Sequence, residues 1–173
     1  MSADVEPPAF RRWMGRWPTG VSVVTAREGE RDFGLTVNAF LSVSLEPPTV
    51  LVSLTEDANS TPVILRTGRF AVNLLRADQE SLSRRFAQVA TTDTKFEGVM
   101  LHRDPNGLAW LDGTLGAISC TVTADHRAGD HRLILGKVVA LESGSDGLPL
   151  IFYRGRYAEP ESTERVHLPP PSG

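Results

Sequence analysis

Residues 34–54 read GLTVNAFLSVSLEPPTVLVSL, and the first half of this stretch alternates in character. Side chains of a strand point to opposite faces in turn, so the alternation predicts one extended strand with two unlike faces. The face expected to lie on the core carries Leu35, Val37, Ala39, Leu41 and Val43. The opposite face carries Thr36, Asn38, Phe40, Ser42 and Ser44, with no charged group among them. This neutral hydrogen-bonding face suits a polar ring system, but the pattern alone fits a Ser- and Thr-rich edge strand equally well.

The segments on either side of this stretch also predict strands. Glu46-Pro47-Pro48 interrupts the stretch, because two prolines cannot sit inside a central strand. Thr49–Thr55 follows as a strand whose nearly continuous apolar side chains predict burial on both faces. Upstream, the β-branched residues of Gly20–Ala26 predict another strand, and the charged segment Arg27–Asp32 predicts a turn.

The rest of the chain contains further strands and a few short helices. Phe10, Trp13, Met14 and Trp17 recur at helical spacing and predict a helix that ends before Pro18. Its aromatic side is expected to pack on the core, with a stacking platform as the alternative. Asn59-Ser60-Thr61-Pro62 predicts the start of a helix that continues to Thr67, with a capping residue followed by Pro62 at the first helical position. Another helix is predicted over Asp78–Phe86, followed by a polar loop over 87–98. Further strands are predicted over Phe70–Leu75, Gly116–Ala124, Leu133–Leu141 and Leu150–Tyr157. Six or seven strands joined mostly by short turns favour a closed or nearly closed antiparallel barrel.

Length and composition indicate one domain with an ordinary core. The 173 residues divide into a flexible leader over 1–8, a folded domain over 9–158 and an extended or disordered tail over 159–173. The net charge of −3 argues against a nucleic-acid partner, and no apolar run approaches the roughly 20 residues of a membrane span. Cys120 is the only cysteine, so no metal site of the multi-cysteine kind is expected and a reducing cytoplasm fits the chain.

Common catalytic and nucleotide motifs are absent from the sequence. No GxGxxG follows a strand, and GxxxxGK[ST], HExxH and GxSxG do not occur. The four histidines are not at metal-ligand spacing, so no metal site is expected. Asp57 and Ser60 have no spacing to any histidine that supports a hydrolytic triad.

Four segments together resemble the short-chain flavin reductases, which are the reductase components of two-component flavin-dependent monooxygenases. These segments are Thr19–Thr25, Gly34–Pro48, Phe70–Leu75 and Gly129-Asp130-His131, accompanied by Phe86-Ala87 and Lys95-Phe96. The resemblance runs from about Phe10 to Tyr157. It implies a split antiparallel β-barrel, a homodimer, bound FMN or FAD, and NADH or NADPH as the hydride donor without a Rossmann domain. A possible partner is a flavin-dependent monooxygenase component.

The resemblance also assigns candidate site residues. Thr36, Val37, Asn38 and Ala39 would lie against the isoalloxazine ring and offer it hydrogen bonds. The ribityl phosphate would meet Ser53, Asn59, Ser60 and Thr61 at a helix N-terminus. Arg84 or Arg85 is the candidate charge partner of that phosphate, with a solvated helix face as the alternative. His131 is assigned to positioning the nicotinamide beside the hydride path, although it could be a simple hairpin-turn histidine.

Three positions depart from the commoner family pattern, and two other functions stay open. Leu35, Ala39 and Glu46 stand where Met, Ser and Asp are frequent, and Ala39 removes a hydroxyl beside the ring. The principal expectation is an NAD(P)H:flavin oxidoreductase. The alternatives are a split-barrel flavoprotein whose tightly bound flavin acts on its own substrate, and a carrier of flavin or haem without turnover.

Overall fold

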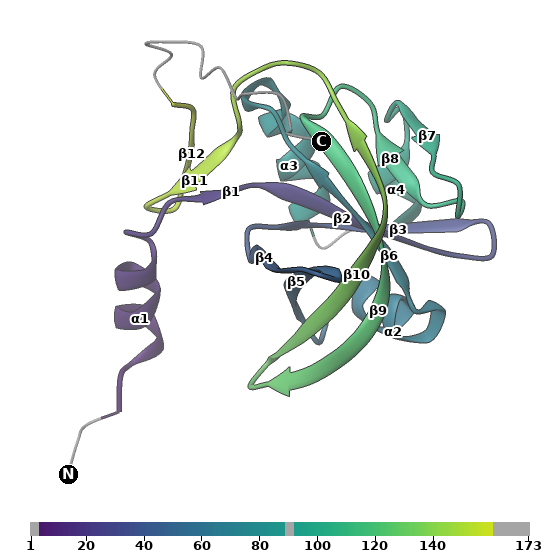
Figure 1. Cartoon of the computed structure of the whole chain (residues 1–173). Helices are drawn as coiled ribbons and strands as arrows, with labels where there is room; N and C mark the ends of the chain where they lie inside the picture. The colour runs from purple at the N-terminus through teal and green to yellow at the C-terminus, as the bar shows by residue number, and fades with distance from the viewer. Residues whose placement is uncertain (1–3, 89–91, 161–173) are drawn as a thin grey trace.

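A seven-stranded antiparallel sheet dominates the computed structural model, which describes residues 4–88 and 92–160 (Figure 1). Its strands are β2 (Ser22–Glu28), β3 (Arg31–Val37), β4 (Phe40–Leu45), β5 (Pro48–Thr55), β6 (Arg69–Leu74), β9 (Gly116–Ala128) and β10 (His131–Ser143). They lie in the order β3-β2-β6-β9-β10-β5-β4, and every neighbouring pair is antiparallel. The predicted antiparallel, mainly β architecture is therefore present.

The sheet curls until its two terminal strands, β3 and β4, come together, because only Asn38 and Ala39 separate them in the chain. The amide of Ser53 on β5 donates a hydrogen bond of 3.0 Å to the carbonyl of Ala39, which continues the pairing of β4 with β5. β3 is the terminal strand on its side and pairs only with β2, so its other edge faces the region between β3 and β5. This is where the curled sheet is left open.

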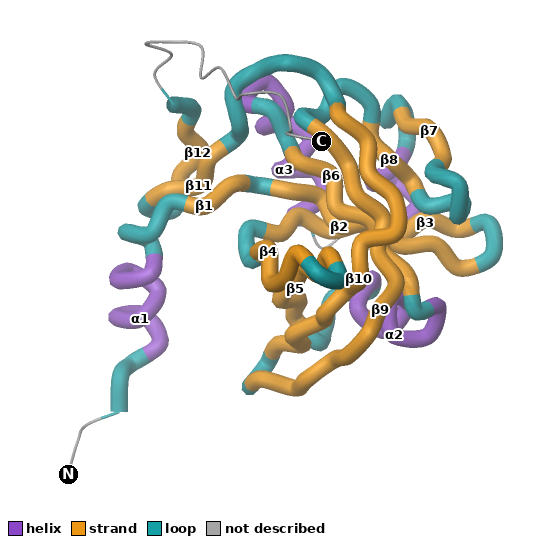
Figure 2. Tube along the Cα trace, in the orientation of Figure 1, coloured by secondary structure: helices purple, strands orange, loops and turns teal. Residues whose placement is uncertain are grey.

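Short helices and two small sheets complete the fold. The helices are α1 (Pro7–Met14), α2 (Ser60–Thr67), α3 (Glu80–Ala87), which a 3₁₀ turn at Ala77–Gln79 precedes, and α4 (Thr92–Phe96). The small sheets contain β1 (Thr19–Gly20), β11 (Ile151–Tyr153) and β12 (Arg156–Ala158) in one, and β7 (Leu101–Arg103) and β8 (Ala109–Leu111) in the other. Figure 2 shows strand over most of the body, with α1 standing apart from it. No helix in the described part of the chain is long and apolar enough to cross a membrane.

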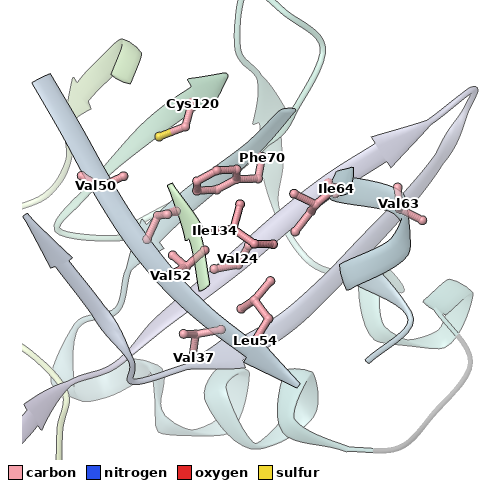
Figure 3. Packing of buried hydrophobic residues seen from close by; sticks show 12 residues of the cluster. Val24, Val37, Val50, Val52, Leu54, Val63, Ile64, Phe70, Cys120 and Ile134 are labelled. Atoms are coloured by element: carbon pink, nitrogen blue, oxygen red, sulfur yellow. The ribbon is translucent and has the colours of Figure 1, made fainter. Parts of the chain in front are cut away.

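The main core lies inside the curled sheet, with α2 at one end (Figure 3). Val24, Val52, Phe70 and Ile134 are fully buried there, and Ile64 of α2 packs against them. Burial of each such aliphatic or aromatic side chain contributes about 1.5–3 kcal/mol. A second cluster forms where α3 covers the sheet, and its members are Val21, Val23, Leu75, Phe86, Leu111 and Leu150.

The long alternating strand predicted from Gly34 to Ser44 is in fact two strands. Asn38 and Ala39 lie outside both β3 and β4, and the alternation restarts after them. Phe40 then packs against the core, whereas Leu41 and Val43 are about half exposed. The predicted apolar core face is therefore wrong from Ala39 onward, because Asn38 and Ala39 are exposed between two strands and break the period of two. The predicted burial of Thr49–Thr55 on both faces is only partly met. Val50, Val52 and Leu54 are buried, whereas the residues between them are partly exposed.

The N-terminal helix differs from its prediction in burial and extent. α1 begins at Pro7, inside the segment expected as a leader, and ends at Met14 rather than at Pro18. None of its residues is buried, and Phe10, Trp13 and Trp17 are 57%, 66% and 68% exposed. Its aromatic residues therefore do not pack on the core of their own chain. The division into leader, domain and tail stays a prediction, and residues 161–173 of the tail lie outside the described residues.

Three further differences concern short elements. The predicted final strand Leu150–Tyr157 is a hairpin, because Arg154 and Gly155 adopt φ of 50° and 76° and reverse the chain. The predicted polar loop over 87–98 contains α4, and the sequence patterns did not indicate β7 or β8. The predicted hairpin is present but longer, since β9 and β10 extend to the Gly129-Asp130 turn.

Candidate active site

A pocket of about 510 Å³ opens where the sheet is left unpaired, between β3 and the end of β5. Its other walls are the ends of α3 and α4, the start of α2 and the first residue of β10. Most of the predicted site residues line it, namely Thr36, Val37, Asn38, Ala39, Ser53, Asn59, Ser60 and His131. The structure thus brings together residues from four separate segments of the sequence.

β3 offers the pocket its backbone more than its hydroxyl groups. The Thr36 hydroxyl already donates a hydrogen bond of 2.6 Å to the carbonyl of Ser83 on α3. The edge of β3 that faces away from β2 has no strand partner, so backbone groups on that edge are available to a ligand unless a side chain already bonds them, as Lys95 does at the Gly34 carbonyl. Asn38 and Ala39 follow as exposed residues at the end of the strand. A flat polar ring beside this edge would find donors and acceptors in a fixed row.

Lys95 of α4 is the pocket's buried cation, and no site role for it was predicted from the sequence. Its side chain lines the pocket, and the residue is only 9% exposed. Its ammonium donates to the carbonyls of Phe86 at 3.2 Å and Gly34 at 3.4 Å. Burial lowers the pKa of Lys95 because the charged form loses hydration. The ammonium is thus held by two neutral oxygens, and an anion in the pocket would complete its environment.

A close contact between β3 and α3 places Lys95. Gly34 lies against the ring of Phe86, and a Cβ atom there would lie 2.6 Å from Cε1 of that ring. Phe96, next to Lys95, packs edge-on against Phe86 with 5.0 Å between the ring centroids. Gly34 therefore lets α3 and α4 approach the strand closely enough for Lys95 to reach its carbonyl. In the sequence, the feature that could have pointed to Lys95 is the Lys95-Phe96 pair, which is among the segments that resemble the family.

His131 lies at the mouth of the pocket, at the first position of β10 after the hairpin turn. Its Nδ1 is 2.7 Å from Oδ1 of Asp130, and this contact lowers the pKa of the Asp130 carboxyl. The Asp130 carbonyl also accepts a hydrogen bond of 3.0 Å from the amide of Glu56, which ties the turn to the end of β5. The contact at Nδ1 orients the ring and leaves Nε2 for a ligand.

The start of α2 differs in detail from the predicted anion site. α2 begins at Ser60, so Pro62 is its third residue rather than its first, and Asn59, which precedes the helix, makes no side-chain capping hydrogen bond. Thr61 does not line the pocket, and its hydroxyl donates a hydrogen bond of 2.8 Å to the carbonyl of Thr55. The exposed Asn59 and the buried Ser60 do line it. The Asn59 side chain is therefore not used to cap α2 and lies in the wall of the pocket.

Arg84 and Arg85, the predicted charge partners, do not line the pocket. Arg84 pairs with Glu80 at 2.6 Å, and its guanidinium lies 4.8 Å from the ring centroid of Tyr157. Arg85 donates to the carbonyl of Glu97 at 2.7 Å. Both are exposed, as expected for a solvated helix face. Their assignment to a phosphate stays a prediction, and the geometry favours Lys95 for that role.

Comparison with known proteins identifies the family of this chain. The family model described as "Flavin reductase like domain" matches residues 14–161. An NADH-dependent flavin reductase of Rhodococcus sp is 39% identical over 160 residues, covering 91% of this chain and 88% of the relative. The reductase component of 4-hydroxyphenylacetate 3-monooxygenase from Thermus thermophilus is 38% identical over 149 residues, covering 86% and 93%.

Solved structures give the same result. An NADH:FAD oxidoreductase of Streptomyces globisporus, in complex with NAD and FAD fragments, superposes with a TM-score of 0.85 at 30% identity. The match covers 94% of this chain and 100% of that structure. The split-barrel fold predicted from the sequence is thereby confirmed. With its curled sheet, its pocket on the unpaired edge of β3 and this likeness over nearly its whole length, the chain belongs to the flavin reductase-like domain family.

Proposed function

We propose that this chain oxidises NADH to reduce a flavin held in the pocket between β3 and β5, and that the reduced flavin serves a separate monooxygenase. The predicted NAD(P)H:flavin oxidoreductase activity is that of its named relatives, one of which uses NADH by name and another of which is a monooxygenase component. The observation that carries the proposal is the pocket itself. It combines an unpaired strand edge with a buried ammonium, which suits a ring system carrying a phosphate.

The open edge of β3 suits the flavin ring. Bound there, the flavin supplies the atom that accepts the hydride, and the chain supplies orientation and electrostatics. Neutral hydrogen bonds could come from the backbone of Thr36 or Val37, from the Ala39 amide and from the side chain of Asn38, which all line the pocket, whereas the Ala39 carbonyl is already bonded to Ser53. Neutral donors fixed in place can stabilise negative charge on the ring without a counter-charge. Replacing Asn38 with Leu is expected to weaken flavin affinity in a protein that stays folded.

Lys95, Asn59 and Ser60 suit the phosphate of that flavin. The Lys95 ammonium has neutral carbonyl partners, and a phosphate would give it a charge-assisted hydrogen bond worth about 1.5–3 kcal/mol. Asn59 and Ser60 add polar groups at the start of α2. Riboflavin, which lacks the phosphate, separates this role from contact with the ring. Lys95→Met should weaken FMN binding more than tenfold and leave riboflavin binding unchanged.

Lys137 provides a matched control, because it is the chain's other lysine and lies exposed on β10. Lys137→Met should leave the affinity for both ligands unchanged. Equal losses of FMN and riboflavin in Lys95→Met would instead place the ammonium against the ring. Unchanged affinity for both would remove Lys95 from the site.

His131 positions the nicotinamide at the mouth of the pocket. Hydride transfer needs no proton donor, so the ring serves to hold the donor over the flavin. His131→Asn should raise KM for NADH with a smaller effect on kcat. A fall in kcat alone, with KM unchanged, would contradict this positioning role.

A second copy of the chain is the proposed partner of α1. Phe10, Trp13 and Met14 of α1 are exposed, and so are Leu41 and Val43 of the terminal strand β4. Exposed apolar patches of this kind mark association surfaces. The homodimer is tested by light scattering on the wild-type protein and on a Phe10→Ser/Trp13→Ser variant, which is expected to shift towards monomer. A wild-type monomer at micromolar concentration would refute it.

Loss of NADH absorbance in the presence of the purified protein tests the function directly. Turnover that depends on added FMN or FAD is the expected outcome, and it also shows which flavin is used. If the protein is purified with bound flavin and oxidises NADH without added flavin, the alternative of a flavoprotein with tightly bound flavin is favoured. No turnover with either flavin would favour the carrier. The cytoplasmic location stays a prediction.

A further inference from the structure

A cluster of four charged side chains adjoins the mouth of the pocket at the tip of the β9–β10 hairpin. Arg127 of β9 and Arg132 of β10 lie directly opposite each other in the strand register. Glu56, the residue after β5, contacts both: its Oε2 is 3.0 Å from Nη2 of Arg127 and its Oε1 is 3.1 Å from Nε of Arg132. Arg132 also pairs with Asp125. Two positive and two negative groups therefore cancel at this tip.

The cluster is continuous with the pocket along the chain. Glu56 lies between Thr55 and Asp57, which both line the pocket, and Arg132 follows His131, which lines its mouth. If His131 holds the nicotinamide, as proposed above, the rest of a dinucleotide donor comes near the residues that adjoin His131. On this side of the pocket, those residues form the tip of the β9–β10 hairpin.

The arginines at this rim are not free to bind an added phosphate. NADPH differs from NADH by one phosphate on the adenosine ribose, and proteins recognise this group with a placed arginine. Arg127 is 70% exposed in its side chain and lies in reach of solvent, but Glu56 holds its guanidinium. Arg132 is held from two sides, and the Asp125 contact raises its pKa. The carboxylates of Glu56, Asp57 and Asp130 would repel a dianionic phosphate at the same place.

We propose that Glu56 makes this chain select NADH over NADPH, because it holds Arg127 and Arg132 and presents its own negative charge at the rim. The inference rests on the proposed function and adds a specificity-determining residue to it. A simpler role for Glu56 is to relieve repulsion between two arginines that face each other across the hairpin. That role affects stability and treats the two donors alike.

Glu56→Gln keeps the shape of the side chain and removes its charge. With flavin saturating, kcat/KM for NADPH is expected to rise at least tenfold, whereas kcat/KM for NADH changes less than threefold. Added salt should abolish the gain, since it depends on a charge pair exposed to solvent. A second change, Arg127→Ala in the Glu56→Gln background, should also remove it. Glu142→Gln, an equal change on the part of β10 remote from the hairpin tip, is the control and should leave the ratio unchanged.

A binding measurement gives a readout that needs no turnover. ADP-ribose and its 2′-phosphate are titrated into wild-type and Glu56→Gln protein by calorimetry. The variant is expected to gain affinity for the 2′-phosphate compound alone. An unchanged ratio of the two donors, or equal losses for both in a folded variant, would overturn the role of Glu56. Absence of NADH turnover by the wild-type protein would instead overturn the proposed function.

Discussion

Gly34→Ala tests whether the contact between β3 and α3 shapes the pocket. Because Gly34 has no side chain, the Phe86 ring lies directly on the strand, and an added Cβ would be 2.6 Å from Cε1 and 2.8 Å from Cδ1 of that ring. It would also be 3.1 Å from Cζ of Phe96. Phe86 is 1% exposed and Phe96 packs against its face, so the ring has little room to move. Gly34 is also paired with Thr25 across the β2–β3 ladder, which restrains the strand.

The expected cost follows from these distances. Carbon atoms in contact prefer about 3.5–4.0 Å, so the added methyl group overlaps the ring by roughly 1 Å. Overpacking of this kind costs about 1–3 kcal/mol. With a urea slope of about 2 kcal/mol per molar, a loss of about 2 kcal/mol lowers the unfolding midpoint by about 1 M. Flavin affinity should fall as well, because Lys95 bonds to the carbonyls of Gly34 and Phe86, the two residues that must separate.

Urea unfolding followed by circular dichroism measures this effect, with Gly20→Ala as the matched control. A Cβ at Gly20 meets nothing within 4 Å, and its φ lies outside the left-handed region, so its midpoint should stay close to that of the wild type. Adding Phe86→Leu to Gly34→Ala should restore part of the loss by removing the overlapping ring atoms. If Gly34→Ala unfolds at the wild-type midpoint and binds flavin as before, the contact does not restrain the pocket.

Three further predictions concern buried or paired polar groups. Lys95→Met should raise the unfolding midpoint of the flavin-free protein near neutral pH, because burial lowers the Lys95 pKa and the folded state carries a poorly hydrated charge. His102 has its pKa raised by hydrogen bonds to Asp112, first, and to Glu142. Its contribution to stability is therefore full below the ordinary pKa of about 6.5 and is lost as pH rises through the raised value, so His102→Gln should destabilise at about pH 5.5 and little at about pH 9 in urea unfolding. Asn73→Leu should cost about 3 kcal/mol in the same assay, since it leaves the Leu111 amide and the Val23 carbonyl without their buried partner.

Each of these predictions has a contrary result. A lower midpoint for flavin-free Lys95→Met would show that its two carbonyl bonds outweigh the cost of burial. Equal destabilisation by His102→Gln at both pH values would show that the ring acts through packing on Trp110 rather than through charge. A loss below about 1 kcal/mol for Asn73→Leu would mean that water replaces the amide.

Local patterns predicted the existence of most long strands better than their ends. The alternating apolar and β-branched residues of β9 and β10, with the Gly129-Asp130 turn between them, predict the hairpin, although both strands run closer to the turn than expected. The break at Asn38-Ala39 was not predictable from alternation, since Leu41 and Val43 continue the apolar pattern in the sequence. Alternation identifies two faces, but it cannot tell which face the curled sheet covers. The same holds for α1, whose aromatic spacing predicts a helix but not the surface that meets it.

Some residues of the candidate site were predictable from the sequence, and its cation was not. Residues of β3, β5 and the start of α2 were predictable because they sit next to motifs that resemble the family. The cation was not, because Arg84, Arg85 and Lys95 carry the same charge in the sequence and differ only in where α3 and α4 direct them. Arg84 and Arg85 contact Glu80, Glu97 and Tyr157 on the surface. The close contact at Gly34 instead lets Lys95 reach the Gly34 carbonyl beside the pocket. The absence of a side chain at Gly34 thus allows Lys95, rather than either arginine, to line the pocket. Changes at Gly34 and at Lys95 are therefore both expected to alter flavin affinity.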